Sequence, residues 1–118
     1  MKNILLVEDD LTYSRIVKTF LEKNGFTVQT AIKVKEAQQL FSNSKFDLII
    51  ADFRLPDGTG MELLQWSKSN YPQTQVILIT HYSDIRIAIK AMKLGAFEYI
   101  TKPINPDELL ATVKESLS

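Results

Sequence analysis

The segment ILLVEDD at residues 4–10 joins four apolar residues to three acids, and LIIAD at residues 48–52 repeats this pattern. A short, continuously apolar run before a helix-like stretch is typical of a buried parallel strand. In an open α/β sheet, ligands bind at the carboxyl ends of the strands, where the strand order reverses. We therefore expect Glu8, Asp9 and Asp52 to converge in one crevice.

Carboxylates that converge in this way need a counter-charge. Like charges a few ångströms apart repel each other unless a proton or a cation lies between them. A hard divalent cation suits oxygen ligands, and Mg²⁺ typically takes one or two carboxylates together with phosphate oxygens and water. The alternative is that each acidic cluster only caps the helix that follows it. Capping does not account for both clusters together with the residues at the other strand ends.

The composition limits the possible functions. The 118 residues suffice for one hydrophobic core, so we expect one domain over residues 1–118. Fourteen basic residues balance fourteen acidic ones without a basic block, which argues against direct nucleic-acid binding by this domain. Because the chain has no cysteine, disulfides and thiolate metal sites are excluded. With neither a bilayer-length apolar stretch nor a signal-peptide core, we expect a cytoplasmic protein without membrane contacts.

Strand-like and helix-like segments alternate five times along the chain, with short loops between them. Further strands are expected at 26–30, 76–79 and 97–100, and helices at 11–24, 33–43, 60–70, 84–94 and from 106 onward. Their start and stop signals are Asp10, Gly25, Thr59 with Glu62, Gly95, and Asn105 with Pro106 and Glu108. With right-handed crossovers, this alternation predicts an α/β fold, a doubly wound (βα)₅ parallel sheet with helices on both faces.

Polar residues stand at four strand ends, namely Glu8 with Asp9, Asp52, Thr80, and Lys102 with Pro103. The stretches LLVEDD (5–10), DFRLPDGTG (52–60), LIT (78–80) and YITKP (99–103) together resemble the receiver domain of two-component response regulators, including the chemotaxis-regulator type. The similarity covers essentially the whole chain. It implies a flavodoxin-like five-stranded sheet of order 2-1-3-4-5, in which the order reverses between the two strands that end in acids.

The resemblance implies a role for each of these residues. Asp52 would be the phosphoacceptor, attacking the phosphorus of a phosphohistidine on a sensor histidine kinase or phosphotransfer protein. Catalysis would consist mainly of charge neutralisation and alignment. The ligands of Mg²⁺ would be Asp9, Asp52 and the backbone carbonyl of Arg54, with Glu8 holding a coordinated water. Lys102 would offer a point positive charge to a phosphoryl oxygen.

The resemblance also implies a switch. The Lys102-Pro103 peptide bond would be cis and would aim the lysine inward. The Thr80 hydroxyl would turn toward a bound phosphoryl group, and the vacated space would let the Tyr99 ring rotate inward. The alternatives are a β-branched strand residue at Thr80 and a half-buried sheet aromatic at Tyr99.

The expected helix at 84–94 has an unusually broad apolar surface. Its apolar residues span an arc of roughly 220°, whereas packing on a sheet needs about 100° or somewhat more. They are Ile85, Ile87, Ala88, Ile89, Ala91, Met92 and Leu94. A well-filled core is one explanation, and coverage by a partner is the other. We favour contact with an output domain, an effector or a second copy of the chain through this helix, the fifth strand and the fifth helix.

Three residues lie at variable positions on the rim of the expected site, namely Arg54, His81 and Tyr82. The family usually has alanine or glycine after the switch threonine, where this chain has His81. A bulky ring there could narrow access to the phosphoryl group, although an exposed loop histidine is an equal alternative. The presence of His81 in place of the family's usual small residue weakly favours a pseudo-receiver, an interaction module that is not regulated by phosphorylation.

The leading interpretation is a phosphorelay signalling module that catalyses only its own phosphorylation and dephosphorylation. The intact set of Asp9, Asp52, Thr80 and Lys102 argues against a pseudo-receiver. A Mg²⁺-dependent aspartyl-phosphate phosphatase usually needs an acid two residues after the nucleophile, where this chain has Arg54. The output stays open, because the chain could be an excised domain or a stand-alone regulator. Residues 95–104 are weakly similar to receivers that precede ATPase transcription activators.

Overall fold

The computed structural model describes residues 2–81 and 83–118, so Tyr82, a predicted rim residue, lies outside the described residues. Five parallel strands form the main sheet: β1 (Asn3–Val7), β2 (Thr27–Ala31), β3 (Leu48–Asp52), β6 (Gln75–Thr80) and β7 (Glu98–Thr101). The helices are α1 (Leu11–Lys23), α2 (Val34–Leu40), α3 (Gly60–Asn70), α4 (Ile85–Lys93) and α5 (Pro106–Ser116). The strand order β2-β1-β3-β6-β7 confirms the predicted order of the five parallel strands.

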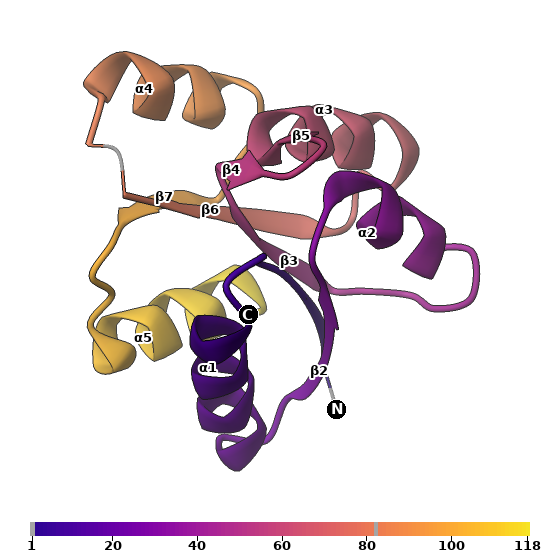
Figure 1. The fold of residues 1–118 in the computed structure, drawn as a ribbon, viewed down its shortest axis with the longest axis vertical. Helices are drawn as coiled ribbons and strands as arrows, with labels where there is room; N and C mark the ends of the chain where they lie inside the picture. Colours follow the sequence, from indigo (N-terminus) through magenta and orange to yellow (C-terminus); the bar gives the residue numbers. More distant parts are fainter. Residues whose placement is uncertain (1, 82) are drawn as a thin grey trace.

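The sheet separates two layers of helices, with α1 and α5 on one face and α2, α3 and α4 on the other (Figure 1). Side chains of successive strand residues point to opposite faces. In β1, Leu5 and Val7 therefore join the core under α2 and α3, while Ile4 and Leu6 join the core under α1 and α5. Because both faces are covered, the central strands are continuously apolar, as the sequence indicated.

Local hydrogen bonds start the helices where the sequence predicts. The Asp10 carboxylate accepts a bond of 3.0 Å from the Tyr13 N–H, which makes Asp10 the N-cap of α1. Thr59 caps α3 through the Glu62 N–H, and Asn105 caps α5 in the same way. At the other end, α1 is followed by Gly25 at a φ of 94°, a left-handed conformation that glycine adopts without strain.

One predicted loop contains regular structure. The turn-forming residues of segment 53–58, which include Pro56 and Gly58, predict an irregular loop. Instead, β4 (Arg54–Leu55) and β5 (Gly58–Thr59) form a short antiparallel hairpin. At its turn, the Asp57 carboxylate accepts hydrogen bonds from the N–H groups of Val34 (2.7 Å) and Lys35 (3.0 Å). These are free N–H groups at the start of α2, so Asp57 caps that helix from a distant part of the chain.

The helices differ from prediction in two ways. The helical spacing of apolar residues in 11–24 predicts one buried face made of Leu11, Ile16, Val17, Phe20 and Leu21. Leu11 and Ile16 are both exposed instead. Packing uses a narrower stripe centred on Val17 and Leu21, with the small Ser14 buried beside them. The second helix ends at Leu40, and a turn replaces its expected last residues. Among the described residues, no helix has the length and apolarity that crossing a membrane requires.

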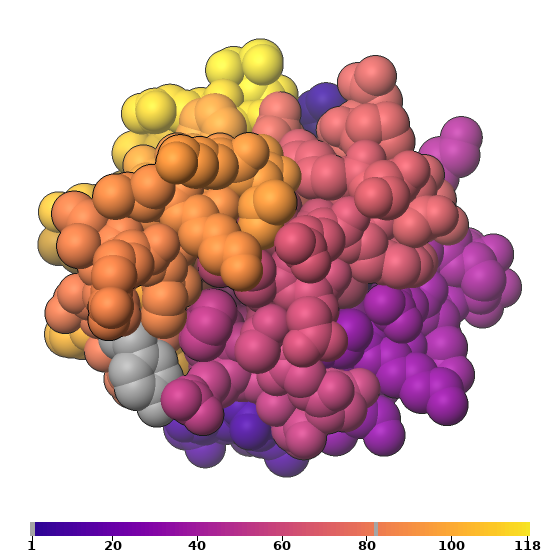
Figure 2. Space-filling model, turned by 90° about the horizontal axis from the view of Figure 1, so that it is seen from above, coloured from indigo at the N-terminus to yellow at the C-terminus, as the bar shows by residue number. Residues whose placement is uncertain are grey.

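The broad apolar arc of α4 lies partly at the surface, as expected. Ile85 is 73% exposed, Ile89 and Met92 are exposed as well, and Ala91 is buried. Figure 2 shows α4, in orange, at the surface beside α3 on this face of the molecule. The helix therefore presents several large apolar side chains to solvent or to a partner.

Candidate functional site

Three carboxylates converge at the carboxyl ends of the two central strands. Because β1 and β3 pair in register up to Val7 and Ala51, the acids that follow emerge side by side. Oxygen atoms from Glu8, Asp9 and Asp52 all lie within 4.8 Å of one another. Glu8 and Asp52 are 1% and 7% exposed, whereas Asp9 is open to solvent. The convergence of these acids that was predicted from the strand ends is present.

Lys102 places an ammonium group against two of these carboxylates. Its Nζ donates to Glu8 Oε1 at 2.6 Å and to Asp52 Oδ2 at 3.0 Å, and its side chain is 6% exposed. Its backbone N–H donates to the carbonyl of Thr80, which ties the residue to the end of β6. The following peptide bond, Lys102-Pro103, is cis, the geometry that the family resemblance implied.

Burial and charge set the protonation of this cluster. Burial raises the pKa of Glu8 to about 7, and the nearby Asp52 adds to the rise, although hydrogen bonds from Lys102 and the Asp10 N–H oppose it. Burial alone would lower the pKa of Lys102, but its hydrogen bonds to Glu8 and Asp52 outweigh that effect and raise it. The ammonium therefore stays charged, and Glu8 is the group that takes up a proton when positive charge is lacking.

The donor set suits a hard cation. Three carboxylates face a single ammonium, so the cluster has an excess of negative charge that a divalent ion would balance. All the donors are oxygen atoms, and one of them belongs to the exposed Asp9, through which an ion could enter. Asp52 Oδ1 accepts a long bond of 3.4 Å from the Arg54 N–H, so the backbone of Arg54 lies close to this carboxylate.

The two predicted switch residues are in contact. Thr80 ends β6 and is fully buried, and β6 pairs with β3 at the level of Asp52. Burial raises the pKa of Tyr99, and a hydrogen bond to Thr80 opposes this rise. Tyr99 is half-buried against the core under α3 and α4. A change at Thr80 would therefore act directly on the Tyr99 hydroxyl.

The described rim residues are both accessible. Arg54 lies on β4 and His81 directly after β6, and both are exposed. His81 is the only histidine in the sequence and is not part of the carboxylate cluster. Among the described residues, the candidate metal ligands are therefore the carboxylate oxygens of Glu8, Asp9 and Asp52, without a histidine nitrogen.

Two residues that shape the site were missed from the sequence. A Cβ at Gly60 would lie 2.5 Å from the carbonyl oxygen of Asp52, so only glycine lets α3 start against the end of β3. The Tyr13 ring lies over Lys102, with 4.5 Å between Nζ and the ring centroid. Gly60 follows a capping threonine and could have been noticed, but no local pattern pointed to Tyr13.

Known proteins resemble this chain along almost its whole length. The family model of the response regulator receiver domain matches residues 4–114. The response regulator protein PilR of Pseudomonas aeruginosa is 37% identical over 113 residues, which are 96% of this chain and 25% of PilR. The regulatory protein AtoC of Escherichia coli is 32% identical over 117 residues, 99% of this chain and 25% of AtoC. The chain thus spans about a quarter of the length of these curated relatives.

Solved structures share the fold. A CheY-like response regulator receiver domain protein from Methanospirillum hungatei gives a TM-score of 0.94 at 35% identity, covering 99% of this chain and 94% of that chain. The beryllofluoride-activated NtrC4 receiver domain dimer gives a TM-score of 0.94 at 32% identity, and the match covers 99% of this chain and 97% of that chain. Nearly every residue of this chain therefore has a structural counterpart in these domains.

Proposed function

This chain belongs to the response regulator receiver domain family, and we propose on that basis that Asp52 accepts a phosphoryl group in a two-component system. The observation that best supports this is the contact of Lys102 Nζ with both Glu8 and Asp52. It places a fixed positive charge beside the proposed nucleophile, where the charge of an incoming phosphoryl group must be balanced. The protein would be a signalling module and not an enzyme acting on an external substrate.

The proposed donor is a phosphohistidine on a sensor histidine kinase or phosphotransfer protein. A carboxylate oxygen of Asp52 forms the new bond to phosphorus as the phosphorus–nitrogen bond breaks, and the imidazole of the donor leaves with that electron pair. Lys102 donates a hydrogen bond to a phosphoryl oxygen. Because its ammonium already contacts Asp52, it needs no large movement to do so.

Mg²⁺ is the proposed cofactor, because the donors are hard oxygen atoms with an excess of negative charge. When bound, the ion would neutralise the charge shared by the carboxylates and the phosphoryl oxygens. The residues that would hold it are Asp9, Asp52 and the backbone carbonyl of Arg54, with Glu8 orienting a coordinated water. Asp10 has no part in this set, since its carboxylate caps α1.

The proposed output is a change at Tyr99 and on the surface of α4, β7 and α5. A phosphoryl oxygen would compete for the Thr80 hydroxyl, which now has Tyr99 as a partner. The exposed apolar residues of α4 suit an output domain, an effector or a second copy of the chain. The similarity to the NtrC4 receiver dimer supports the last option. We also propose a cytoplasmic location. From the similarity to the transcriptional regulatory protein ZraR of Escherichia coli, we propose that the whole protein regulates transcription.

Two other functions are less well supported. A pseudo-receiver would not need Lys102 and the three carboxylates together in one crevice. An aspartyl-phosphate phosphatase would need an acid two residues after Asp52, where the exposed Arg54 stands. Water can still reach a phosphoaspartate through the open side of the crevice, so slow self-dephosphorylation is compatible with the proposal.

Intact-mass spectrometry tests this function. With Mg²⁺ and a small phosphodonor such as phosphoramidate, the parent protein should gain one phosphoryl group, and Asp52→Asn should gain none. Asp57→Asn is the matched control, because Asp57 is an aspartate of the same loop outside the carboxylate cluster. Labelling of Asp52→Asn at the parent level would contradict the proposal.

A further inference from the structure

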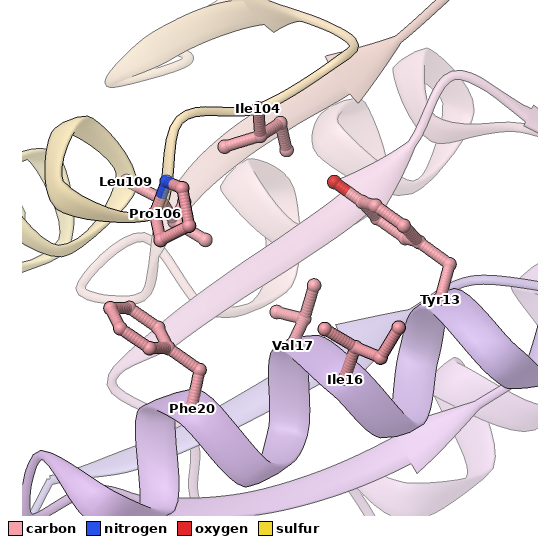
Figure 3. Close-up of a pocket in the computed structure, with 7 residues that line it drawn as sticks. All are labelled: Tyr13, Ile16, Val17, Phe20, Ile104, Pro106 and Leu109. Carbon is pink, nitrogen blue, oxygen red and sulfur yellow. The ribbon is translucent and has the colours of Figure 1, made fainter.

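A groove lies between α1 and α5, and one of its lining residues, Tyr13, contacts Lys102 of the candidate site. It has a volume of about 140 Å³ and an apolar lining that includes Val17, Phe20 and Leu109. Figure 3 shows Tyr13 on α1 at one end of this groove, with its hydroxyl directed toward Ile104. We propose that Tyr13 is a positioning residue whose aromatic ring holds the Lys102 ammonium in place for phosphoryl transfer.

The ammonium of Lys102 is enclosed on three sides. It has three N–H donors, of which two positions are taken by Glu8 Oε1 and Asp52 Oδ2. The Tyr13 ring faces the ammonium at 4.5 Å from its centroid, well within the range of about 6 Å at which a cation is attracted to the face of an aromatic ring. The ring also helps to exclude water, since the Lys102 side chain is almost completely buried.

The start of α1 determines where the ring lies. Asp10 accepts a hydrogen bond from the Tyr13 N–H, so the cap that begins the helix also fixes the backbone of Tyr13. From there, the side chain extends between α1 and the segment that follows Lys102 (Figure 3). Its hydroxyl oxygen is buried without a hydrogen-bond partner among the described residues. The ring therefore makes the contact with Lys102, and the hydroxyl is dispensable for it.

The inference rests on the proposed function, in which both anionic partners of Lys102 change during the reaction. Glu8 would hold water of a bound cation, and Asp52 would become an acyl phosphate. A hydrogen bond to either carboxylate therefore weakens as the reaction proceeds, whereas the attraction to a neutral ring does not depend on metal or phosphate. Tyr13 would keep the ammonium directed at the phosphoryl oxygens while its carboxylate contacts are exchanged.

Three variants separate the ring from the hydroxyl and from general packing. Tyr13→Phe keeps the ring, and Tyr13→Leu removes it. Phe20→Leu removes an aromatic ring from the same helix and the same groove, away from Lys102. Circular dichroism and thermal melts establish that each variant is folded. Labelling by phosphoramidate at saturating Mg²⁺ gives the rate constant, and calorimetry gives the affinity for Mg²⁺.

Proton NMR of the unphosphorylated protein gives a readout that is independent of the reaction. The ε-methylene protons of Lys102 should be shifted upfield by the ring current in the parent and in Tyr13→Phe, and not in Tyr13→Leu. We expect Tyr13→Leu to lower the labelling rate constant roughly three- to tenfold, with Mg²⁺ affinity within about twofold of the parent. Tyr13→Phe and Phe20→Leu should label at the parent rate.

Each other result overturns the inference. Parent-like labelling of Tyr13→Leu, or an equal loss in Phe20→Leu, would reduce Tyr13 to a groove-lining residue. A loss in Tyr13→Phe as large as that in Tyr13→Leu would assign the effect to the hydroxyl. A parent protein that takes up no phosphoryl group would overturn the proposed function itself, and the role of Tyr13 with it.

Discussion

Lys102 donates a 2.6 Å hydrogen bond to Glu8, a residue 94 positions earlier in the chain. The contact joins the end of β7 to the end of β1, across the ends of β6 and β3, which lie between them in the sheet. Burial nevertheless raises the pKa of Glu8 to about 7, so one ammonium does not fully compensate the carboxylates around it. The remaining negative charge is the physical basis for expecting a second cation.

Glu8→Gln should change how stability depends on pH in the absence of metal. Because the pKa of Glu8 is raised from 4.5 to about 7, the folded protein binds more protons than the unfolded chain within this window. The parent therefore loses stability as pH rises through it, by up to roughly 3 kcal/mol, and the variant does not. Urea unfolding in chelator across this range measures the difference. Parallel stability curves for the two proteins would contradict the raised pKa.

Asp9→Ala should abolish detectable Mg²⁺ binding and phosphoryl uptake while leaving the metal-free fold as stable as the parent or slightly more stable. The reason is relief of repulsion among the three carboxylates. Asp10→Ala is the control, because it removes the cap of α1 and should cost about 1 kcal/mol while metal binding is kept. Calorimetry and thermal melts measure both effects. A large loss of stability in Asp9→Ala would instead assign Asp9 a capping role.

Asp57→Ala should destabilise the protein by about 1 kcal/mol, because two N–H groups at the start of α2 lose their acceptor. Burial raises the pKa of Asp57, but the hydrogen bonds from the Lys35 and Val34 N–H groups, with smaller contributions from the Asp57 N–H and the Lys33 charge, together outweigh it and lower this pKa. The stabilisation is therefore present above the ordinary carboxyl pKa and is lost as pH falls through the lowered one. Unfolding measurements at neutral and at acidic pH test the prediction. It fails if Asp57→Ala loses the same amount of stability relative to the parent at the two pH values.

Thr80→Ala should separate phosphorylation from its readout. In the parent, beryllium fluoride with Mg²⁺ should shift the NMR signals of Tyr99 and α4, because the Thr80 hydroxyl leaves Tyr99 for the phosphate mimic. In the variant, signals around Asp52 should still shift, but those of Tyr99 should not. Identical shifts at Tyr99 in both proteins would show that another group transmits the change.

His81→Ala tests the rim. If the imidazole hinders approach to Asp52, the variant should be labelled faster by small phosphodonors, and its phosphoaspartate should hydrolyse faster. The exposed position of His81 directly after β6 allows such an effect on access. Labelling and decay followed by mass spectrometry give both rates. Equal rates in the two proteins would leave His81 as an exposed loop residue.

The fold and the convergence of the strand-end acids could be predicted from features that are local in the chain, whereas the roles expected of Thr80, Tyr99 and Lys102 were implied by the family resemblance. Apolar runs of strand length, helical periodicity and caps three residues apart act between near neighbours, as Asp10 and Tyr13 show. The convergence of the strand-end acids also follows from the alternation of strands and helices, since parallel strands bring their carboxyl ends to one edge of the sheet. The same reasoning correctly anticipated that the apolar surface of α4 is larger than its packing on the sheet requires.

Other features depend on contacts between distant parts of the chain. Asp57 caps a helix that begins 23 residues earlier, and no spacing rule along the sequence predicts such a pair. The rotation of α1 that exposes Leu11 and directs Tyr13 at Lys102 is set by packing against β2 and α5, not by the pattern of α1 alone. Periodicity specifies which residues share a face, but the neighbouring elements determine which part of that face is buried, because burial is a property of the assembled layers.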